Sequence, residues 1–280
     1  MLHKAYRVMC LQLRENLFSG RVLLLFVLMA MFIGSTVAPM NDFASAYDLG
    51  ITPWAFPLLC NDYICQLVLM MGAVVLFSNA PFTDELHIYI VTRSGRTAWA
   101  LGICLYLAAV SLIYVLLMVL TSLLAVLPHL ELSDAWGKAW NAIGSGSYRY
   151  EYGVTLQPSR YILGRFTPWE AALYSFGLEW ACCLFLGLVA YAVSALGGST
   201  LGTLTAAGFV VLDIAVSNAL SPWCYHISPV SMAQLANLAS AQSIYGLSWQ
   251  YAVQFFAGSI VLLTGLSLWS QTGKRRKTHE

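Results

Sequence analysis

PFTDELHIYIVTRSGRTAW, residues 81–99, is a charged break with internal order between two long apolar runs. Thr83 precedes two acidic residues, and Gly95 follows a segment whose apolar residues recur at helical spacing. A Thr side chain caps a helix N-terminus, acids favour the first turn, and Gly favours the position after the end. The stretch therefore predicts a short amphipathic helix from Thr83 to Ser94. Residues 88–91, Ile-Tyr-Ile-Val, also suit a strand, which is the alternative structure for this segment.

The composition is that of a polytopic membrane protein. Of the 280 residues, 59% are hydrophobic and 10% are charged, whereas soluble domains carry about 25% charged residues. A water-soluble fold could not bury so much apolar surface. The net charge of +1 gives no indication of nucleic-acid binding. The seven cysteines fall mostly inside apolar runs without Cys-x-x-Cys spacing, so we interpret them as small hydrophobic residues, not metal ligands or disulfides.

Residues 1–21 predict an amphipathic helix that lies in the membrane interface. Its apolar positions recur at spacings of three and four, and they are Leu2, Tyr6, Met9, Leu13 and Leu17. A solvated basic tail is the alternative. The apolar run that follows ends near Ala44-Ser45-Ala46, which fits the small-x-small pattern of a signal-peptide cleavage site. We interpret this run instead as a first transmembrane helix.

Six apolar runs are each near the ~20 residues that cross the hydrocarbon layer. We expect six transmembrane helices, at residues 22–40, 54–77, 99–127, 169–196, 201–220 and 251–269. Tryptophans stand near many of their ends, where interfacial aromatic side chains are favoured; they are Trp54, Trp99, Trp169, Trp223, Trp249 and Trp269. The expected fold class is therefore an all-α polytopic membrane protein.

The positions of lysine and arginine set the expected orientation. One side of the six-span arrangement carries Lys4, Arg7, Arg14, Arg21, Arg93, Arg96, Lys274, Arg275, Arg276 and Lys277, and the other carries only Lys138, Arg149, Arg160 and Arg165. Because the richer side faces the cytoplasm, we expect both termini and residues 81–99 to be cytoplasmic. On the outer side we expect a long loop, residues 128–168, and a short helix from Ser231 to Gln242 that lies on or dips into the outer leaflet.

Two acidic residues lie inside expected spans, Glu179 in the fourth and Asp213 in the fifth. A charge in the hydrocarbon layer is costly, so each is a candidate for lining a translocation path or for binding a cation or proton. The alternative is structural, with each carboxyl group protonated or bonded to a hydroxyl group of a neighbouring helix. Asp62 lies near an outer end, where we expect water or head groups to solvate it.

Gly198 and Gly202 form a Gly-x-x-x-Gly pair, which predicts close helix packing, either inside the chain or between two chains. No catalytic signature accompanies these features: His-Glu-x-x-His, Gly-x-Ser-x-Gly and Gly-x-x-x-x-Gly-Lys-Ser/Thr do not occur. We therefore expect neither a zinc protease, a serine hydrolase nor a nucleotide-binding loop in this chain. The prediction is a chain that is not an enzyme and holds no metal or cofactor of its own.

This arrangement resembles the six-helix permease subunits of ABC-type exporters. The matching parts are the interfacial helix at Leu2 to Phe18, the helix at Thr83 to Ser94 after the second span, and the segment at Ser231 to Gln242 before the last span. The resemblance implies that Thr83 to Ser94 is the coupling helix, which docks in a groove of a separate ATPase, and that the segment before the last span is re-entrant. It also implies two permeases, identical or homologous, with two ATPases that bind ATP and Mg²⁺.

The resemblance further implies roles for individual residues. Around the Thr83 cap, polar contacts with the ATPase are expected from Asp84, Glu85, Arg93 and Arg96, and the helix is expected to seat through Phe82, Leu86 and Ile90. The implied activity is export of a peptide, drug or lipid-like substrate across a bacterial plasma membrane. The alternative is a proton- or ion-coupled secondary transporter, in which Glu179 and Asp213 carry the coupling ion. An intramembrane enzyme would need a nucleophile beside these two acids, and none is evident.

Overall fold

The computed structural model describes residues 1–80, 87–146, 151–239 and 247–273. In these ranges the chain is helical and contains no strand beyond one isolated bridge between Ile51 and Leu130. Five helices are long and apolar enough to cross a membrane. They are α2 (Gly20–Tyr47), α6 (Arg96–Ala125), α9 (Pro168–Gly197), α10 (Ser199–Asn218) and α13 (Trp249–Gly273). The expectation of an all-helical, multi-pass membrane protein is confirmed at this level.

Each of these five helices corresponds to one expected span, with some differences in length. The largest difference is in α2, which continues to Tyr47 although the sequence predicted an end at residue 40. Pro39 lies inside this helix. A proline does not end a membrane helix when neighbouring groups can satisfy the carbonyl that it leaves free. The first span is therefore longer than the apolar run at residues 22–40 predicted.

The prediction of one continuous second span at residues 54–77 was wrong. The segment forms a short helix α3 (Ala55–Leu59) and a longer helix α4 (Tyr63–Phe77), with a break between them. Asp62 is the N-cap of α4, and its Oδ1 accepts hydrogen bonds of 3.1 Å from the backbone N–H groups of Ile64 and Cys65. With 15 residues, α4 extends for only about 22 Å, less than the ~30 Å hydrocarbon layer.

Two side chains at this break hold distant parts of the chain together. Asn61 donates to Ser175 Oγ of α9 at 3.4 Å and accepts from the backbone N–H of Ala236 at 2.7 Å. The second oxygen of Asp62 accepts from the backbone N–H of Gln157, in the long loop, at 3.1 Å. Asp62 is only 8% exposed. The expectation that water or head groups solvate it was wrong, because backbone N–H groups take their place.

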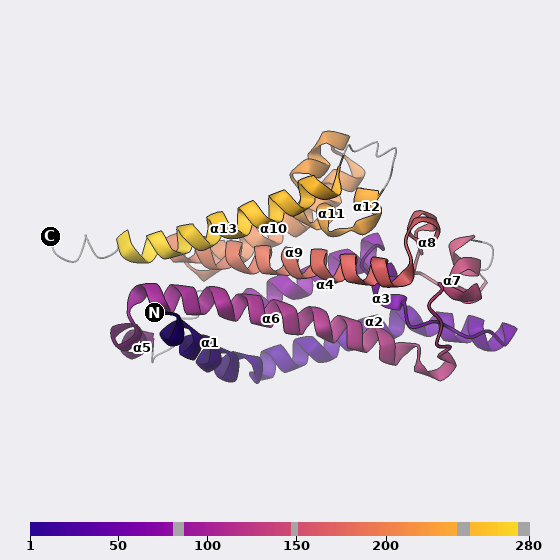
Figure 1. Ribbon diagram of the computed structural model, residues 1–280, viewed down its shortest axis with the longest axis horizontal. Coiled ribbons are helices and arrows are strands. Elements are labelled where there is room, and N and C mark those ends of the chain that lie inside the picture. Colours follow the sequence, from indigo (N-terminus) through magenta and orange to yellow (C-terminus); the bar gives the residue numbers. More distant parts are fainter. Residues whose placement is uncertain (81–86, 147–150, 240–246, 274–280) are drawn as a thin grey trace.

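Two short helices lie at the end of the bundle that holds the N-terminus and the end of α13 (Figure 1). They are α1 (Leu2–Leu17) and α5 (His87–Ser94), and both pack against α6. The close α1–α6 crossing depends on Gly102, where a Cβ would lie 2.6 Å from Cβ of Val8. At the opposite end lie two helices of the long loop, α7 (Gly137–Gly144) and α8 (Arg160–Arg165) (Figure 1).

The predicted N-terminal helix is present, and its inward face includes three of the five expected apolar positions, Met9, Leu13 and Leu17. Ala5, Val8 and Gln12 are buried against the bundle, whereas Leu2 and Tyr6 are 73% and 57% exposed. Met9, Leu13 and Leu17 are partly buried and pack against the core, whereas Leu2 and Tyr6 remain on the outside. This arrangement suits a helix at a membrane interface, where lipid can cover the exposed apolar side chains.

The short helix expected from Ser231 to Gln242 is two helices in the part that the structure describes. After the 3₁₀ helix η2 (Pro222–His226) come α11 (Pro229–Ala233) and α12 (Leu235–Ala239), with extended backbone at Gln234 between them. Residues 240–242 lie outside the described residues. All five residues of α11 are buried, and this helix contacts α4, α9 and α10. The segment therefore folds into the bundle instead of lying on its surface.

The Gly-x-x-x-Gly pair serves packing inside the chain. Gly202 is buried, and a Cβ there would lie 2.3 Å from the backbone oxygen of Ala190 in α9. Gly198 lies in the tight connection between α9 and α10 with a φ of +90°, a conformation that favours glycine. Of the two alternatives from sequence, Gly202 fits close contact between α9 and α10 within one chain.

Gly202→Ala should destabilise the protein, because its added methyl group would overlap the backbone of α9. Overpacking of this kind costs about 1–3 kcal/mol, which thermal unfolding in detergent micelles would detect as a lower midpoint. Gly208→Ala in the same helix is the matched control, since a Cβ at Gly208 meets nothing within 4 Å. Alanine there should be neutral or stabilising by up to ~1 kcal/mol. Equal unfolding midpoints for the two variants would contradict the close α9–α10 contact.

Asp62→Ala should remove both the cap of α4 and the link to the long loop. Loss of an N-cap alone costs about 0.5–2 kcal/mol, and the unfolding midpoint should fall accordingly. Backbone amide exchange should accelerate at residues 64, 65 and 157, because their N–H groups lose the acceptor. Asp42→Ala, which removes an exposed carboxyl group from α2, is the control. Unchanged exchange at residue 157 would show that Asp62 does not hold the loop.

Candidate functional site

The structure describes only the second part of the predicted coupling helix. Phe82, Thr83, Asp84, Glu85 and Leu86 lie outside the described residues, so their predicted roles stay predictions. From His87 to Ser94 the chain is helical, which excludes the strand alternative for residues 88–91. Gly95 ends this helix with a φ of +91°, as the sequence predicted, and α6 begins at the next residue.

The described coupling residues fall on different sides of α5. Ile90 is half-buried and packs against the core of its own chain, so its contacts lie inside the bundle. Arg93 is exposed, as is Arg96, which opens α6. Tyr89 is 73% exposed and presents an aromatic ring that the sequence reasoning gave no docking role. The sequence shows Tyr89 as one of the apolar residues of the segment 81–99, but only the structure shows that its side chain is exposed.

Between α1 and α5 lies a basic groove, defined by Lys4, Arg7 and Arg93, with a volume of about 640 Å³. Lys4 Nζ donates to the backbone oxygen of Arg93 at 3.5 Å, which links the two helices. Glu15 and Tyr89 also line the groove. Three cations and one carboxylate leave an excess of positive charge, which favours an acidic protein surface or anionic lipid as neighbour.

Glu179 lies in α9 with no exposed surface. Gln66 of α4 donates from Nε2 to Glu179 Oε2 at 3.3 Å, and the Cys60 thiol, a weak donor, lies against the same carboxyl group. Glu179 Oε1 has no partner of ordinary hydrogen-bond geometry among the described residues, and neither has Gln66 Oε1. A buried carboxylate without full pairing is costly, so the neutral, protonated form fits this environment best.

Asp213 lies in α10 and is 1% exposed. Its Oδ1 accepts a hydrogen bond from the Ser231 hydroxyl of α11, which lies 2.8 Å from the Ser228 hydroxyl. Asp213 Oδ2 has no hydrogen-bond partner in the described part of the chain. The structural alternative from sequence, a bond to a hydroxyl group of a neighbouring helix, is therefore present at Asp213. The oxygen without a hydrogen bond could hold a proton of the carboxyl group.

We use the name buried polar layer for Glu179, Asp213 and three side chains near one or both of them, Gln66, Cys182 and Ser231. Cys182 lies one turn after Glu179 in α9, within electrostatic range of both carboxyl groups, and its thiol contacts the backbone oxygen of Pro229 in α11 at 3.8 Å. The described residues contain no group of three or more His, Cys, Asp or Glu side chains that could hold a metal ion. The carboxyl, amide and hydroxyl groups of this layer can exchange protons and hydrogen bonds.

Gln66 and Ser231 are polar members of this layer that the sequence reasoning did not assign to it. Gln66 could have been found, because an amide inside an apolar run carries the same burial cost as an acid. Ser231 could not, because its neighbour Asp213 is 18 residues away in the chain.

No family model, curated protein or solved structure matches this chain. Inferences about its function therefore depend on its own residues.

Glu179→Gln should keep the unfolding midpoint close to that of the wild type, because an amide can still bond Gln66 and resembles a protonated carboxyl group. Glu179→Ala should lower it, since the buried Gln66 amide would lose its partner at a cost of about 1–3 kcal/mol. Thermal unfolding in micelles measures both, with Glu15→Ala at an exposed position of α1 as control. A Gln variant as unstable as the Ala variant would show that the negative charge itself holds the layer.

Proposed function

We propose that this chain is the membrane-spanning subunit of an ATP-driven transporter of the ABC type, with ATP hydrolysis in a separate subunit. The position of α5 is the main support for this proposal. This helix joins α6 through Gly95 alone, packs on the core through Ile90, and leaves Tyr89 and Arg93 exposed. No loop separates α5 from α6, a helix of 30 residues. A partner bound to the exposed face of α5 would therefore move α6 with it.

The charge of this end supports the same proposal. Lys4, Arg7, Arg93 and Arg96 are all exposed there, on α1, α5 and the start of α6. An excess of Lys and Arg is typical of the cytoplasmic side of membrane proteins. In the proposed orientation the two short helices face the cytoplasm, where two ATPase subunits with ATP and Mg²⁺ would reach them.

In the proposed mechanism the ATPase partner supplies the force, and helices of this chain that line the translocation path move. When the two ATPases bind ATP and close together, they would pull α5. The helices α4 and α6, which flank residues 78–95, would shift with it. A path between this chain and a second permease would then change its exposure. The exposed apolar side chains of α13, such as Val261 at 72% and Leu262 at 59%, need cover from lipid or from that second permease. The cargo in this proposal is a peptide, drug or lipid-like molecule, exported across the plasma membrane of a bacterium.

A second candidate function is proton- or ion-coupled secondary transport. The observation in its favour is the buried polar layer, where Glu179 and Asp213 each keep one carboxyl oxygen without a hydrogen-bond partner among the described residues. Buried carboxyl groups in membrane bundles often belong to proton relays. The broken second span, α3 and α4, is also a feature of such transporters.

Purification separates the two candidates. A tag at the C-terminus and mild detergent extraction from the native host should recover an ATPase with a phosphate-binding loop beside the wild-type chain. Tyr89→Ala and Arg93→Glu should each reduce that recovery at least roughly tenfold, because exposed Tyr and Arg residues are common anchors of interfaces. Trp223→Ala, which removes an exposed aromatic from η2, should not.

The opposite outcome would favour the second candidate. A chain that purifies alone and moves solute into proteoliposomes along a proton gradient, without ATP, would overturn the ABC proposal. In that case transport should be lost in Glu179→Gln or Asp213→Asn, because neither amide can release a proton. Transport that survives both substitutions would exclude the buried polar layer as the proton pathway.

A further inference from the structure

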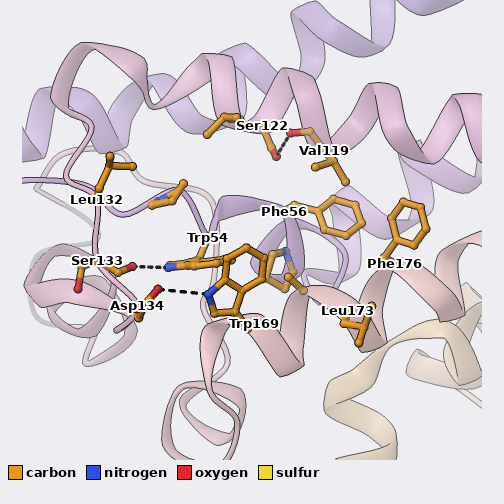
Figure 2. A pocket seen from close by; sticks show the side chains of 14 residues that line it. Trp54, Phe56, Val119, Ser122, Leu132, Ser133, Asp134, Trp169, Leu173 and Phe176 are labelled. Atoms are coloured by element: carbon orange, nitrogen blue, oxygen red, sulfur yellow. Dashed lines mark hydrogen bonds between the residues drawn. The ribbon is translucent and has the colours of Figure 1, made fainter.

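A pocket of about 760 Å³ opens at the end of the bundle that holds the long loop. Its volume is typical of sites for small molecules, which span roughly 300–1,000 Å³. Four segments that are distant in sequence form its walls: α3 with the residues before it, the end of α6, residues 132–134, and the start of α9 (Figure 2). We refer to it as the tryptophan pocket, because Trp54 and Trp169 stand together in its wall.

The tryptophan pocket has a buried floor and an exposed apolar rim. Trp54, Phe56 and Ser122 on the floor are 7%, 4% and 1% exposed. At the rim, Trp169 and Leu173 of α9 are 64% and 69% exposed. A ligand in this space would therefore be covered at its inner end and open along one side.

The polar groups in the pocket already have partners. Trp54 Nε1 donates to the backbone oxygen of Ser133 at 2.9 Å, and Trp169 Nε1 donates to Asp134 Oδ1 at 3.2 Å. Ser122 Oγ donates to the backbone oxygen of Val119 at 2.8 Å. Water needs two to four polar partners to occupy a buried site, and this floor offers few. The floor is thus suited to an apolar occupant.

The two indole rings are fixed by the long loop. Their centroids are 4.7 Å apart at an interplanar angle of 70°, an edge-to-face arrangement. Figure 2 shows both ring nitrogens directed at the loop residues Ser133 and Asp134, which leaves the apolar ring surfaces on the pocket. An amphiphile at a membrane interface meets rings of this kind, apolar on their faces and bonded at their nitrogens.

Charge at the rim restricts the head group. Asp134 is exposed and uses one carboxylate oxygen to accept from Trp169. A carboxylate accepts several hydrogen bonds, so it can take a further donor from a ligand. No lysine or arginine occurs among the described residues that line the pocket. An ammonium group therefore fits this rim better than a purely anionic head group.

Access to the pocket is from the side. Leu173 of α9, which lines the pocket, is 69% exposed and lies on a helix that is long and apolar enough to span a membrane. A bilayer covers such surfaces, so an acyl chain from the adjacent leaflet can enter the pocket without passing through water.

We propose that the tryptophan pocket binds one apolar chain of an amino-phospholipid, with its ammonium group beside Asp134. Binding requires no ATPase and no second chain, so the proposal stands whether or not the chain is an ABC permease. The occupant is a lipid of the ethanolamine type, drawn from the leaflet on the side of the long loop.

Native mass spectrometry of the full chain tests the proposal with two probes of identical acyl chains, phosphatidylethanolamine and phosphatidylglycerol. The wild type should retain one molecule of phosphatidylethanolamine at least tenfold better than phosphatidylglycerol. Ala172→Phe, which fills the pocket from its wall, should abolish retention. The control is Ala257→Phe, at an exposed position of α13, which should retain the lipid as the wild type does. Asp134→Asn should lose the preference between the head groups.

A second measurement avoids dependence on Ala172→Phe, which could fold poorly. Phosphatidylethanolamine with bromine on its acyl chain should quench tryptophan fluorescence of the wild type, and less so in Trp169→Phe. Retention of both lipids to the same extent by the wild type would overturn the proposal and indicate bulk lipid only. A preference for phosphatidylglycerol, or unchanged retention in a folded Ala172→Phe variant, would overturn it as well.

Discussion

The fold of this protein depends on the hydrogen bonds that satisfy backbone groups at one helix break inside the bundle. Between α3 and α4 the chain leaves the helical path at residues 60–62, where backbone groups would otherwise lack partners. Asn61 and Asp62 supply these partners and, with their remaining atoms, reach the long loop at Gln157 and the segment before α13 at Ala236. Non-helical backbone at membrane depth is tolerated only when protein groups satisfy it in this way. The break therefore organises the whole end of the molecule.

Much of the fold could be predicted from sequence because it depends on local pattern. Hydropathy alone located five spanning helices, and a glycine after an amphipathic run located the end of α5 at Gly95. The break in the second span could not be predicted, since hydropathy averages over residues 54–77 and is blind to hydrogen bonds from Gln157 and Ala236. The end of the first span was also missed, because α2 continues to Tyr47, past the apolar run that ends at residue 40.

The candidate sites, like the fold, were only partly predictable from the sequence. The two buried acids were visible as charges in apolar runs, but their partners Gln66 and Ser231 come from other helices, and only the structure brings them together. The tryptophan pocket was not visible at all, because its walls come from four separate segments. Near the cytoplasmic end of the proposed orientation, the structure adds Tyr89 as an exposed aromatic, while the roles of residues 82–86 stay predictions.

The two ends of the bundle thus differ in chemistry, with a basic groove at one end and an apolar pocket at the other. Force applied to the basic end would reach the apolar end through α6, which lines the pocket with Val119, Ser122 and Leu123. In the proposed transporter this helix connects the ATPase to the lipid-facing site. A rigid helix of 30 residues is suited to such a role.

The most direct test is a photo-reactive amino acid at position 89, activated in living cells, with mass spectrometry of the cross-linked product. We expect a covalent adduct with an ATPase that contains a phosphate-binding loop, and no such adduct from position 223. Adducts at position 89 with lipid alone, or with other segments of this chain alone, would contradict a docked ATPase and with it the proposed function.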